Sequence, residues 1–148
     1  MSDPARFVAA FAAYWAAPDL DVLPALLAPD VRLRQPLAEP MDGLAAARAG
    51  FARIFAALPD LRGEVDRWSA AGEYVFVEFR LRATLAGRPF EWPVVDRFTL
   101  RDGLATERVS YFDPLPLVLA GLRRPSGWRQ LWTAGGVRAL LSARGTPR

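Results

Sequence analysis

The sequence predicts an α+β domain in which three N-terminal helices pack on one face of a curved, mainly antiparallel sheet. Apolar residues recur with a helical period up to about residue 58 and alternate with period 2 from residue 62 onward. Short turn sequences separate four consecutive strand patterns, as in an antiparallel meander. Helices first and strands second favour the α+β class, with the helices as one layer on the sheet.

Two helices are predicted before the first strand. The first begins with Asp3 as a capping acid and Pro4 in the first turn, and Pro18 ends it. A second, shorter helix is expected from its cap at Asp19 to about Ala28.

A short strand and a third helix follow. Alternation of apolar and polar residues predicts a strand over Val31–Gln35, and the segment Pro36–Gly43 is expected to be a loop. Asp42 is expected to cap the third helix, which runs over Leu44–Leu58 until Pro59 stops it.

The rest of the domain is predicted to be the meander. Its four strands are expected near residues 62–71, 73–85, 89–101 and 104–113, joined by turns at Gly72-Glu73, Ala86-Gly87 and Asp102-Gly103. The sequence thus predicts one domain over residues 1–113 and a C-terminal tail over residues 114–148.

Composition excludes several kinds of chemistry. The 148 residues include no cysteine and no histidine, and all 19 basic residues are arginine. Thiolate nucleophiles, zinc–thiolate sites, histidine bases and lysine Schiff bases are therefore excluded, and no metal site or cofactor is expected. The N-terminus has no basic segment leading into an apolar run, so we expect a soluble, cytoplasmic protein.

The tail concentrates positive charge. Residues 114–148 contain six arginines and no acid, whereas residues 1–113 have a net charge of −3. Because the body lacks a basic stripe, the sequence predicts no nucleic-acid partner. The tail also carries an apolar stripe of Trp128, Leu131, Trp132, Leu140 and Leu141. Packing on the body or on a homodimer partner is favoured for this stripe over contact with a membrane surface.

Asp96 is the most informative candidate for chemistry. It is the one charged residue on an otherwise apolar strand face that includes Trp92, Val94 and Phe98. Burial in such a setting disfavours the charged form of a carboxyl group, so Asp96 is expected to donate a hydrogen bond or a proton. The alternative is a structural ion pair with an arginine, such as Arg108 of the last strand.

Other polar residues remain open between structural and functional roles. Tyr14 lies on the apolar stripe of the first helix and needs a partner for its hydroxyl group if it is buried. Glu78 shares a face with Tyr74 and Phe76, which fits either solvent exposure or a partly enclosed surface. Ser110 lies on the same face of the last strand as Arg108.

The order of elements resembles the nuclear transport factor 2-like superfamily, and more closely its SnoaL-like and ketosteroid isomerase-like branches. The resemblance covers about residues 4–115. It rests on Asp19-Leu20-Asp21, Leu27-Ala28-Pro29-Asp30-Val31, Val95-Asp96-Arg97-Phe98 with Asp102-Gly103, and Ser110-Tyr111-Phe112-Asp113. It implies a cone-like fold with a deep apolar cavity and frequent homodimers, but it does not fix the reaction.

The resemblance also implies roles for residues. Tyr14 and Asp96 fall where ketosteroid isomerases have their oxyanion-hole tyrosine and protonated aspartic acid. Gln35 falls where those enzymes have the aspartate that moves the proton, and glutamine cannot abstract one. The side chains expected to bind the ligand or to form the cavity walls are Gln35, Phe11, Phe55, Trp68, Glu78, Trp92, Arg108, Ser110 and Phe112.

The expected function is binding of a small, largely apolar molecule with a carbonyl or hydroxyl group. As an enzyme, the protein would be an isomerase, cyclase or lyase acting through an enol, with Asp96 and Tyr14 as oxyanion donors. The alternative is a ligand-binding or dimeric interaction protein that has lost its catalytic base at Gln35.

Overall fold

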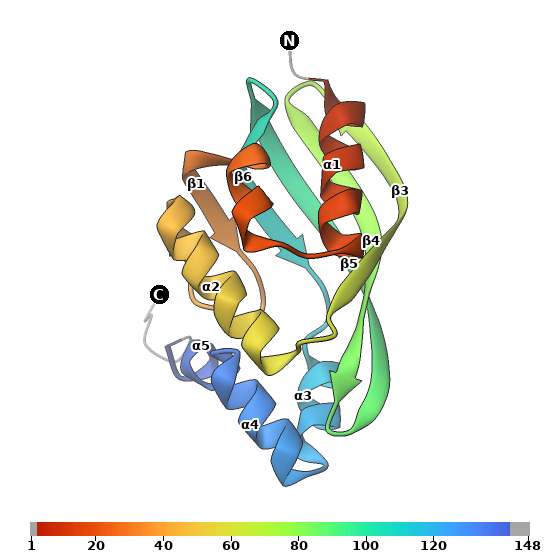
Figure 1. Ribbon diagram of the computed structural model, residues 1–148, viewed down its shortest axis with the longest axis vertical. Coiled ribbons are helices and arrows are strands. Elements are labelled where there is room, and N and C mark those ends of the chain that lie inside the picture. Colours follow the sequence, from red (N-terminus) through yellow and green to blue (C-terminus); the bar gives the residue numbers. More distant parts are fainter. Residues whose placement is uncertain (1–2, 143–148) are drawn as a thin grey trace, which may run out of the picture.

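The computed structural model describes residues 3–142 and has the predicted α+β architecture (Figure 1). A six-stranded sheet has the order β2-β1-β6-β5-β4-β3, and its neighbouring strands are antiparallel except for the parallel pair β1 and β6. In chain order the elements are α1 (Pro4–Ala16), the 3₁₀ helix η1 (Leu20–Ala25), β1 (Leu27–Arg34), β2 (Met41–Asp42), α2 (Leu44–Ala57), β3 (Arg62–Ala71), β4 (Tyr74–Leu85), β5 (Arg88–Arg101), β6 (Leu104–Tyr111), α3 (Leu115–Leu122), α4 (Pro125–Thr133) and α5 (Gly136–Ser142).

The meander confirms the prediction from period-2 alternation. Its three turns lie at the predicted positions. In two of them both central residues have positive φ, 51° and 78° at Ala86-Gly87 and 54° and 80° at Asp102-Gly103. Tight hairpin turns with this geometry match the twist of the strands they join, so each turn fixes the register of its hairpin.

The segment before β1 differs from the prediction. The predicted second helix is a short 3₁₀ helix that contains Pro24, and β1 begins at Leu27 rather than at Val31. Leu27 pairs with Ala105 of β6, and this strand pairing replaces the last predicted turn of helix.

The prediction that Asp42 caps the third helix is wrong. Gly43 is the N-cap residue of α2, with no side-chain cap, and Asp42 belongs to the two-residue strand β2. The Asp42 carboxylate instead accepts a hydrogen bond from Arg34 Nη2 at 2.8 Å. The pairing of Met41 with Leu33 draws this part of the predicted loop into the sheet.

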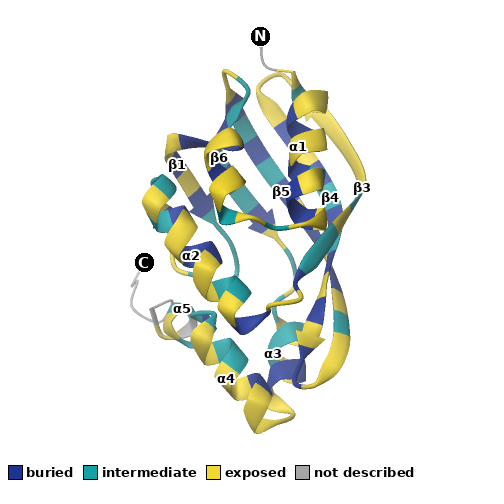
Figure 2. Cartoon of the chain, viewed as in Figure 1, coloured by how far each residue is buried: buried dark blue, intermediate teal, exposed yellow. Residues whose placement is uncertain are grey.

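The core lies between α1, α2 and one face of the sheet. The buried sides of these elements face one another in Figure 2. The ring centroid of Phe11 on α1 lies 5.1 Å from that of Phe79 on β4 and 5.2 Å from that of Phe98 on β5. These edge-to-face contacts fix α1 across the middle of the sheet.

The tail forms three short helices at one end of the molecule (Figure 1). Pro125 begins α4, and Gly135, with a φ of 87°, precedes α5. Gly127 of α4 lies so close to α3 that an added Cβ atom would be 2.0 Å from the carbonyl oxygen of Gly121. This close approach requires glycine and lets α4 turn back along the body.

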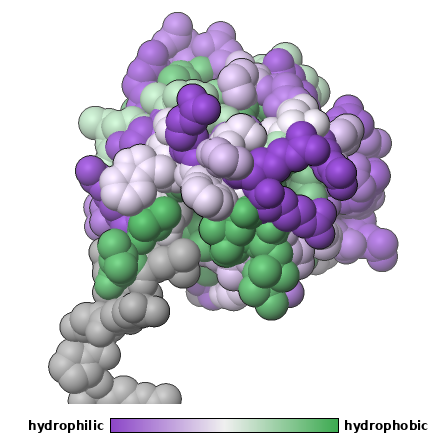
Figure 3. All heavy atoms as spheres, turned by 90° about the horizontal axis from the view of Figure 1, so that it is seen from below, coloured by the Kyte–Doolittle hydropathy of each residue, from purple (hydrophilic) through white to green (hydrophobic). Residues whose placement is uncertain are grey.

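The predicted apolar stripe of the tail is only partly covered. Leu131 packs near Gly121, whereas Trp128, Trp132 and Leu141 are more than half exposed. The side chain of Leu140 lies outside the described residues. Figure 3 shows apolar groups beside strongly hydrophilic ones at this end of the molecule. No helix in the described part of the chain is long and apolar enough to cross a membrane. The homodimer stays a prediction.

Gln130 of α4 fastens the tail to the body through three hydrogen bonds. Its Nε2 donates to the carbonyl oxygens of Ala57 at 3.2 Å and Thr84 at 3.0 Å, and its Oε1 accepts from the amide of Ala86 at 2.9 Å. Ala86 lies in the hairpin turn between β4 and β5, and Ala57 ends α2. The Gln130 side chain therefore links α4 to both α2 and the β4–β5 turn.

We predict that Gln130→Ala lowers the free energy of unfolding by about 1–3 kcal/mol, because three backbone groups lose their partner. Urea unfolding followed by circular dichroism measures the change. The matched control is Arg129→Ala on the exposed side of the same helix, which is expected to cost less than about 0.5 kcal/mol. Equal losses in the two variants would show that Gln130 does not fasten the tail.

Candidate functional site

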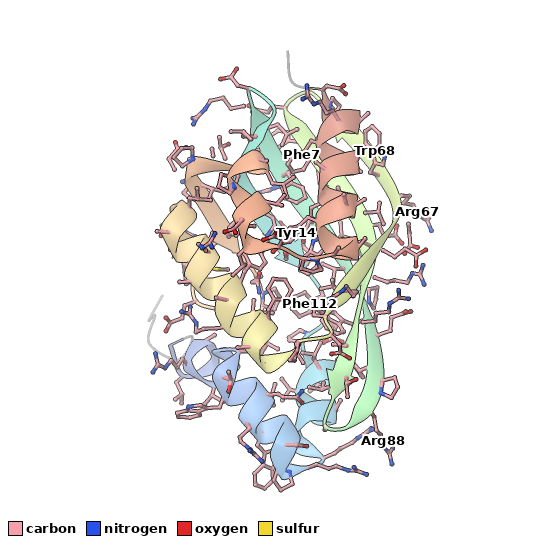
Figure 4. All side chains as sticks on the ribbon, viewed as in Figure 1. Phe7, Tyr14, Arg67, Trp68, Arg88 and Phe112 are labelled. Atoms are coloured by element: carbon pink, nitrogen blue, oxygen red, sulfur yellow. The ribbon has the colours of Figure 1, made fainter. Side chains whose placement is uncertain are left out.

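A cavity of about 90 Å³ lies between the inner face of the sheet, α2 and the C-terminal helices. Of the residues predicted to bind a ligand or to act on it, those that line it are Gln35, Trp92, Asp96, Arg108, Ser110 and Phe112. Most of the other lining side chains are apolar, and Leu117 of α3 and Ala134, just after α4, close the end near the tail. Figure 4 shows Phe112 pointing into the interior between the helices and the sheet.

Strand alternation and register bring the polar groups of the cavity together. Asp96 of β5 pairs directly with Ser110 of β6, and Arg108 lies two residues earlier on the same inner face. Gln35 follows the end of β1. Because β1 runs parallel to β6, the Gln35 side chain lies beside Arg108. Asp96, Arg108 and Ser110 are the buried polar or charged side chains of the part of the chain that the structure describes.

Asp96 is completely buried, with 0% of its surface exposed. Its Oδ1 accepts a hydrogen bond from Ser110 Oγ, and its Oδ2 has no hydrogen-bond partner among the described residues. Loss of solvation raises the pKa of the Asp96 carboxyl group, an effect that the nearby Arg108 and the Ser110 hydroxyl only partly oppose. In its protonated form, the carboxyl group can donate a hydrogen bond from Oδ2 into the cavity.

Arg108 is held by several neighbours rather than by Asp96 alone. Its Nη1 lies 3.9 Å from Asp96 Oδ2, and its Nη2 donates a hydrogen bond to Gln35 Oε1. Its guanidinium carbon lies 5.3 Å from the centroid of the Phe51 ring, which adds a cation–π contact. These contacts stabilise a buried cation without requiring an ionised Asp96.

Tyr14 does not line the cavity that Asp96 lines. It is buried on α1 and borders a separate void of about 20 Å³, which Arg108 also lines. Its hydroxyl group has no hydrogen-bond partner among the described residues, and burial raises the pKa of that hydroxyl well above its usual value. The expectation that Tyr14 and Asp96 share one cavity is thus corrected, because Arg108 stands at the boundary of the two spaces.

Four further predicted wall or ligand residues lie away from the cavity. Phe11 and Phe55 pack in the aromatic core around Trp15, with ring centroids 6.3 Å and 6.2 Å from that of Trp15. Trp68 is 42% exposed on the edge strand β3, and Glu78 forms an ion pair with Arg67 at 3.0 Å. Figure 4 shows Arg67 and Trp68 at the outer edge beside β3.

The physical reasons for these corrections differ. Glu78 follows the buried Val77 in β4, so alternation turns its side chain to the outer face. Trp68 pairs with Val77, but β3 has no neighbour on its other side to cover the ring.

Sequence reasoning missed several residues that line the cavity. Trp15 follows Tyr14 on the stripe of the first helix and could have been found there. Leu117 and Ala134 carry no local signal, because their position depends on how the tail packs against the body. Residues 3–142 contain no group of three or more acidic side chains that could hold a metal ion.

A wider surface groove of about 310 Å³ adjoins the cavity. It lies between α2 and α4–α5 and shares Ile54 and Ala134 with the cavity wall. Exposed Arg53 and Arg138 lie along it, together with Glu39.

Comparison with known proteins relates this geometry to a family. Residues 8–108 match the family model of the SnoaL-like domain. No curated protein matches the chain at a significant level.

Solved structures share the fold. A candidate SnoaL-like polyketide cyclase from Jannaschia sp. CCS1 is 25% identical with a TM-score of 0.74, over 82% of this chain and 93% of that one. IdmH, a candidate polyketide cyclase from Streptomyces antibioticus, is 22% identical with a TM-score of 0.70, over 80% and 97%. A protein with a ketosteroid isomerase-like fold from Catenulispora acidiphila DSM 44928, in complex with trimethylamine, is 23% identical with a TM-score of 0.68, over 72% and 85%.

Proposed function

This chain belongs to the SnoaL-like domain family, within the nuclear transport factor 2-like superfamily, and from that premise we propose that it binds a small, largely apolar molecule with a carbonyl or hydroxyl group. The observation that carries the proposal is Asp96, a fully buried carboxyl group with an unpartnered oxygen in an apolar cavity. A buried carboxyl kept neutral by its surroundings is a strong hydrogen-bond donor for a ligand oxygen. The apolar walls would hold the body of the ligand.

The size of the cavity limits how much of a ligand it can enclose. An apolar cavity of about 150 Å³ holds one benzene molecule, so the 90 Å³ cavity encloses only part of a one- or two-ring molecule. The rest of such a ligand would have to extend into the adjoining groove.

Two versions of the function follow, and different observations favour each. In the enzyme version, Asp96 polarises a carbonyl group and stabilises an enol during an isomerase, cyclase or lyase reaction. The candidate polyketide cyclases among the structural neighbours support this version. In the second version the protein binds its ligand without turnover. Gln35 supports it, since its amide accepts a hydrogen bond from Arg108 and cannot act as a base.

The test uses 2-decalone, a two-ring ketone, and decalin, the hydrocarbon without the oxygen. We predict that calorimetry shows about tenfold tighter binding of the ketone, because only the ketone accepts the Asp96 hydrogen bond. Equal affinities, or no binding of either compound, would contradict the proposal. Exchange of the protons next to the carbonyl group in D₂O, followed by NMR, separates the two versions. Exchange faster than in buffer alone indicates enol chemistry, and its absence indicates binding alone.

A further inference from the structure

Two indole N–H groups in the cavity wall take no part in the function proposed above. Trp15 on α1 and Trp92 on β5 both line the cavity and are 3% and 7% exposed. The Nε1 atom of each is buried without a hydrogen-bond partner among the described residues. A buried donor without a partner destabilises a folded protein, so an acceptor is expected to reach such a group from the cavity.

Trp92 and Asp96 line the cavity from the two ends of a short row of inward-facing residues on β5. Both side chains point inward from β5, four residues apart, which places their backbones about 13 Å from each other along the strand. The apolar Val94 lies between them on the same face and is paired with Phe79 of β4. Leu117 of α3 lines the cavity as well. This row of the cavity wall therefore has a polar group at each end and an apolar residue in the middle.

The chemistry of the two ends is matched. An indole nitrogen is a donor only, so Trp92 can bind an acceptor oxygen but no ammonium or amide N–H group. The Asp96 carboxyl group presents its unpartnered oxygen at the other end. We propose that Trp92 binds a second oxygen of the ligand, and that the protein selects elongated apolar molecules with a carbonyl or ether oxygen at each end.

This inference rests on the proposed function and makes it more specific. Asp96 would hold the first oxygen and Trp92 the second, with the apolar body of the molecule against Val94 and Phe79. Trp15 lines the same cavity from the helical side, so its N–H group is the competing candidate for the second oxygen.

The experiment compares 2-decalone with decalin-2,6-dione, which has a carbonyl group at each end. We expect the wild-type protein to bind the dione about tenfold more tightly than the monoketone. Trp92→Phe keeps an aromatic ring beside Phe90, whose centroid lies 5.8 Å away, but removes the N–H group. This variant is expected to lose the preference, so that its affinities for the dione and for 2-decalone lie within about twofold of each other.

Two matched variants make the result specific. Trp68→Phe removes an exposed indole outside the cavity and is expected to keep the full preference for the dione. Loss of the preference in Trp15→Phe but not in Trp92→Phe would overturn the assignment to Trp92. The inference would also be overturned if Trp92→Phe kept the preference for the dione, or if the wild type had no such preference. The proposed function would still hold in either case, provided that the wild type binds 2-decalone.

A second measurement observes the Trp92 N–H group in the wild-type protein. In ¹H–¹⁵N spectra of the wild-type protein, the Trp92 indole resonance, assigned from its loss in Trp92→Phe, is expected to shift downfield with the dione and much less with 2-decalone. The same small shift with both ligands would contradict the inference. Failure of 2-decalone itself to bind would instead refute the proposed function.

Discussion

Replacing Asp96 with alanine is expected to weaken binding of 2-decalone about ten- to hundredfold, because the ketone oxygen then enters an apolar space without its donor. Calorimetry at one fixed pH measures the loss. The matched control is Asp96→Asn, whose amide can accept from Ser110 and donate to the ketone, and we expect it to bind within about threefold of the wild type. An affinity of Asp96→Ala equal to that of the wild type would show that Asp96 does not bind the ketone.

The wild type and Asp96→Asn also give a prediction for the pH dependence of stability. Burial raises the pKa of Asp96 in the folded protein above the value of about 3.9 in the unfolded chain. The folded state therefore keeps the proton to a higher pH than the unfolded state does. The stabilisation that this gives is complete below about pH 4 and is lost as the pH rises through the folded-state pKa. Arg108 and Ser110, which face the carboxyl group, reduce this effect without reversing it.

Asp96→Asn removes this titration. Urea unfolding between about pH 4 and pH 8 should therefore show the wild type losing stability relative to Asp96→Asn as the pH rises. The opposite trend, with the wild type gaining relative stability toward pH 8, would show that Asp96 is an ionised partner of Arg108.

Phe98→Ala is expected to cause the largest loss of stability, about 3–5 kcal/mol. Phe98 is 1% exposed, and its ring centroid lies 4.9 Å from that of Phe7 and 5.2 Å from that of Phe11. Removing the ring leaves a void under α1 that the rigid sheet cannot close. Urea unfolding measures the change in the free energy of unfolding.

The control for this prediction is Phe76→Ala on the outer face of β4. Phe76 is 39% exposed, so we expect its loss to cost less than about 1 kcal/mol. Comparable losses in the two variants would mean that the outer face of the sheet is packed as tightly as its inner face.

The meander was predictable because its signals are local. Alternation determines which side chains share a face, and the glycines of Ala86-Gly87 and Asp102-Gly103 mark the positions of the tight turns. The start of β1 and the strand β2 were not predictable, because they depend on pairing with distant strands. Asp42 shows the limit, since a good capping residue becomes a strand residue when its neighbour pairs with Leu33.

The site was predictable to the extent that it depends on alternation. Asp96 stands out as a carboxylate in an apolar row, and Arg108 and Ser110 follow from the same period on the next strand. Alternation does not tell whether an edge residue such as Trp68 is covered. It also cannot show that Tyr14, on a helix, borders a different space from Asp96.

The tail has a consequence for how the protein is made in the cell. Leu117 and Ala134 complete the cavity wall, yet the ribosome adds them only after the whole meander. At roughly 5–20 residues per second, residues 114–148 take roughly 2–7 s to be added. During that time the meander can already pack against α1 and α2 while the apolar side of the cavity stays open to water. A nascent chain with such a surface is a target for chaperones and is prone to aggregate. Premature termination after Asp113 would make this open intermediate the final product.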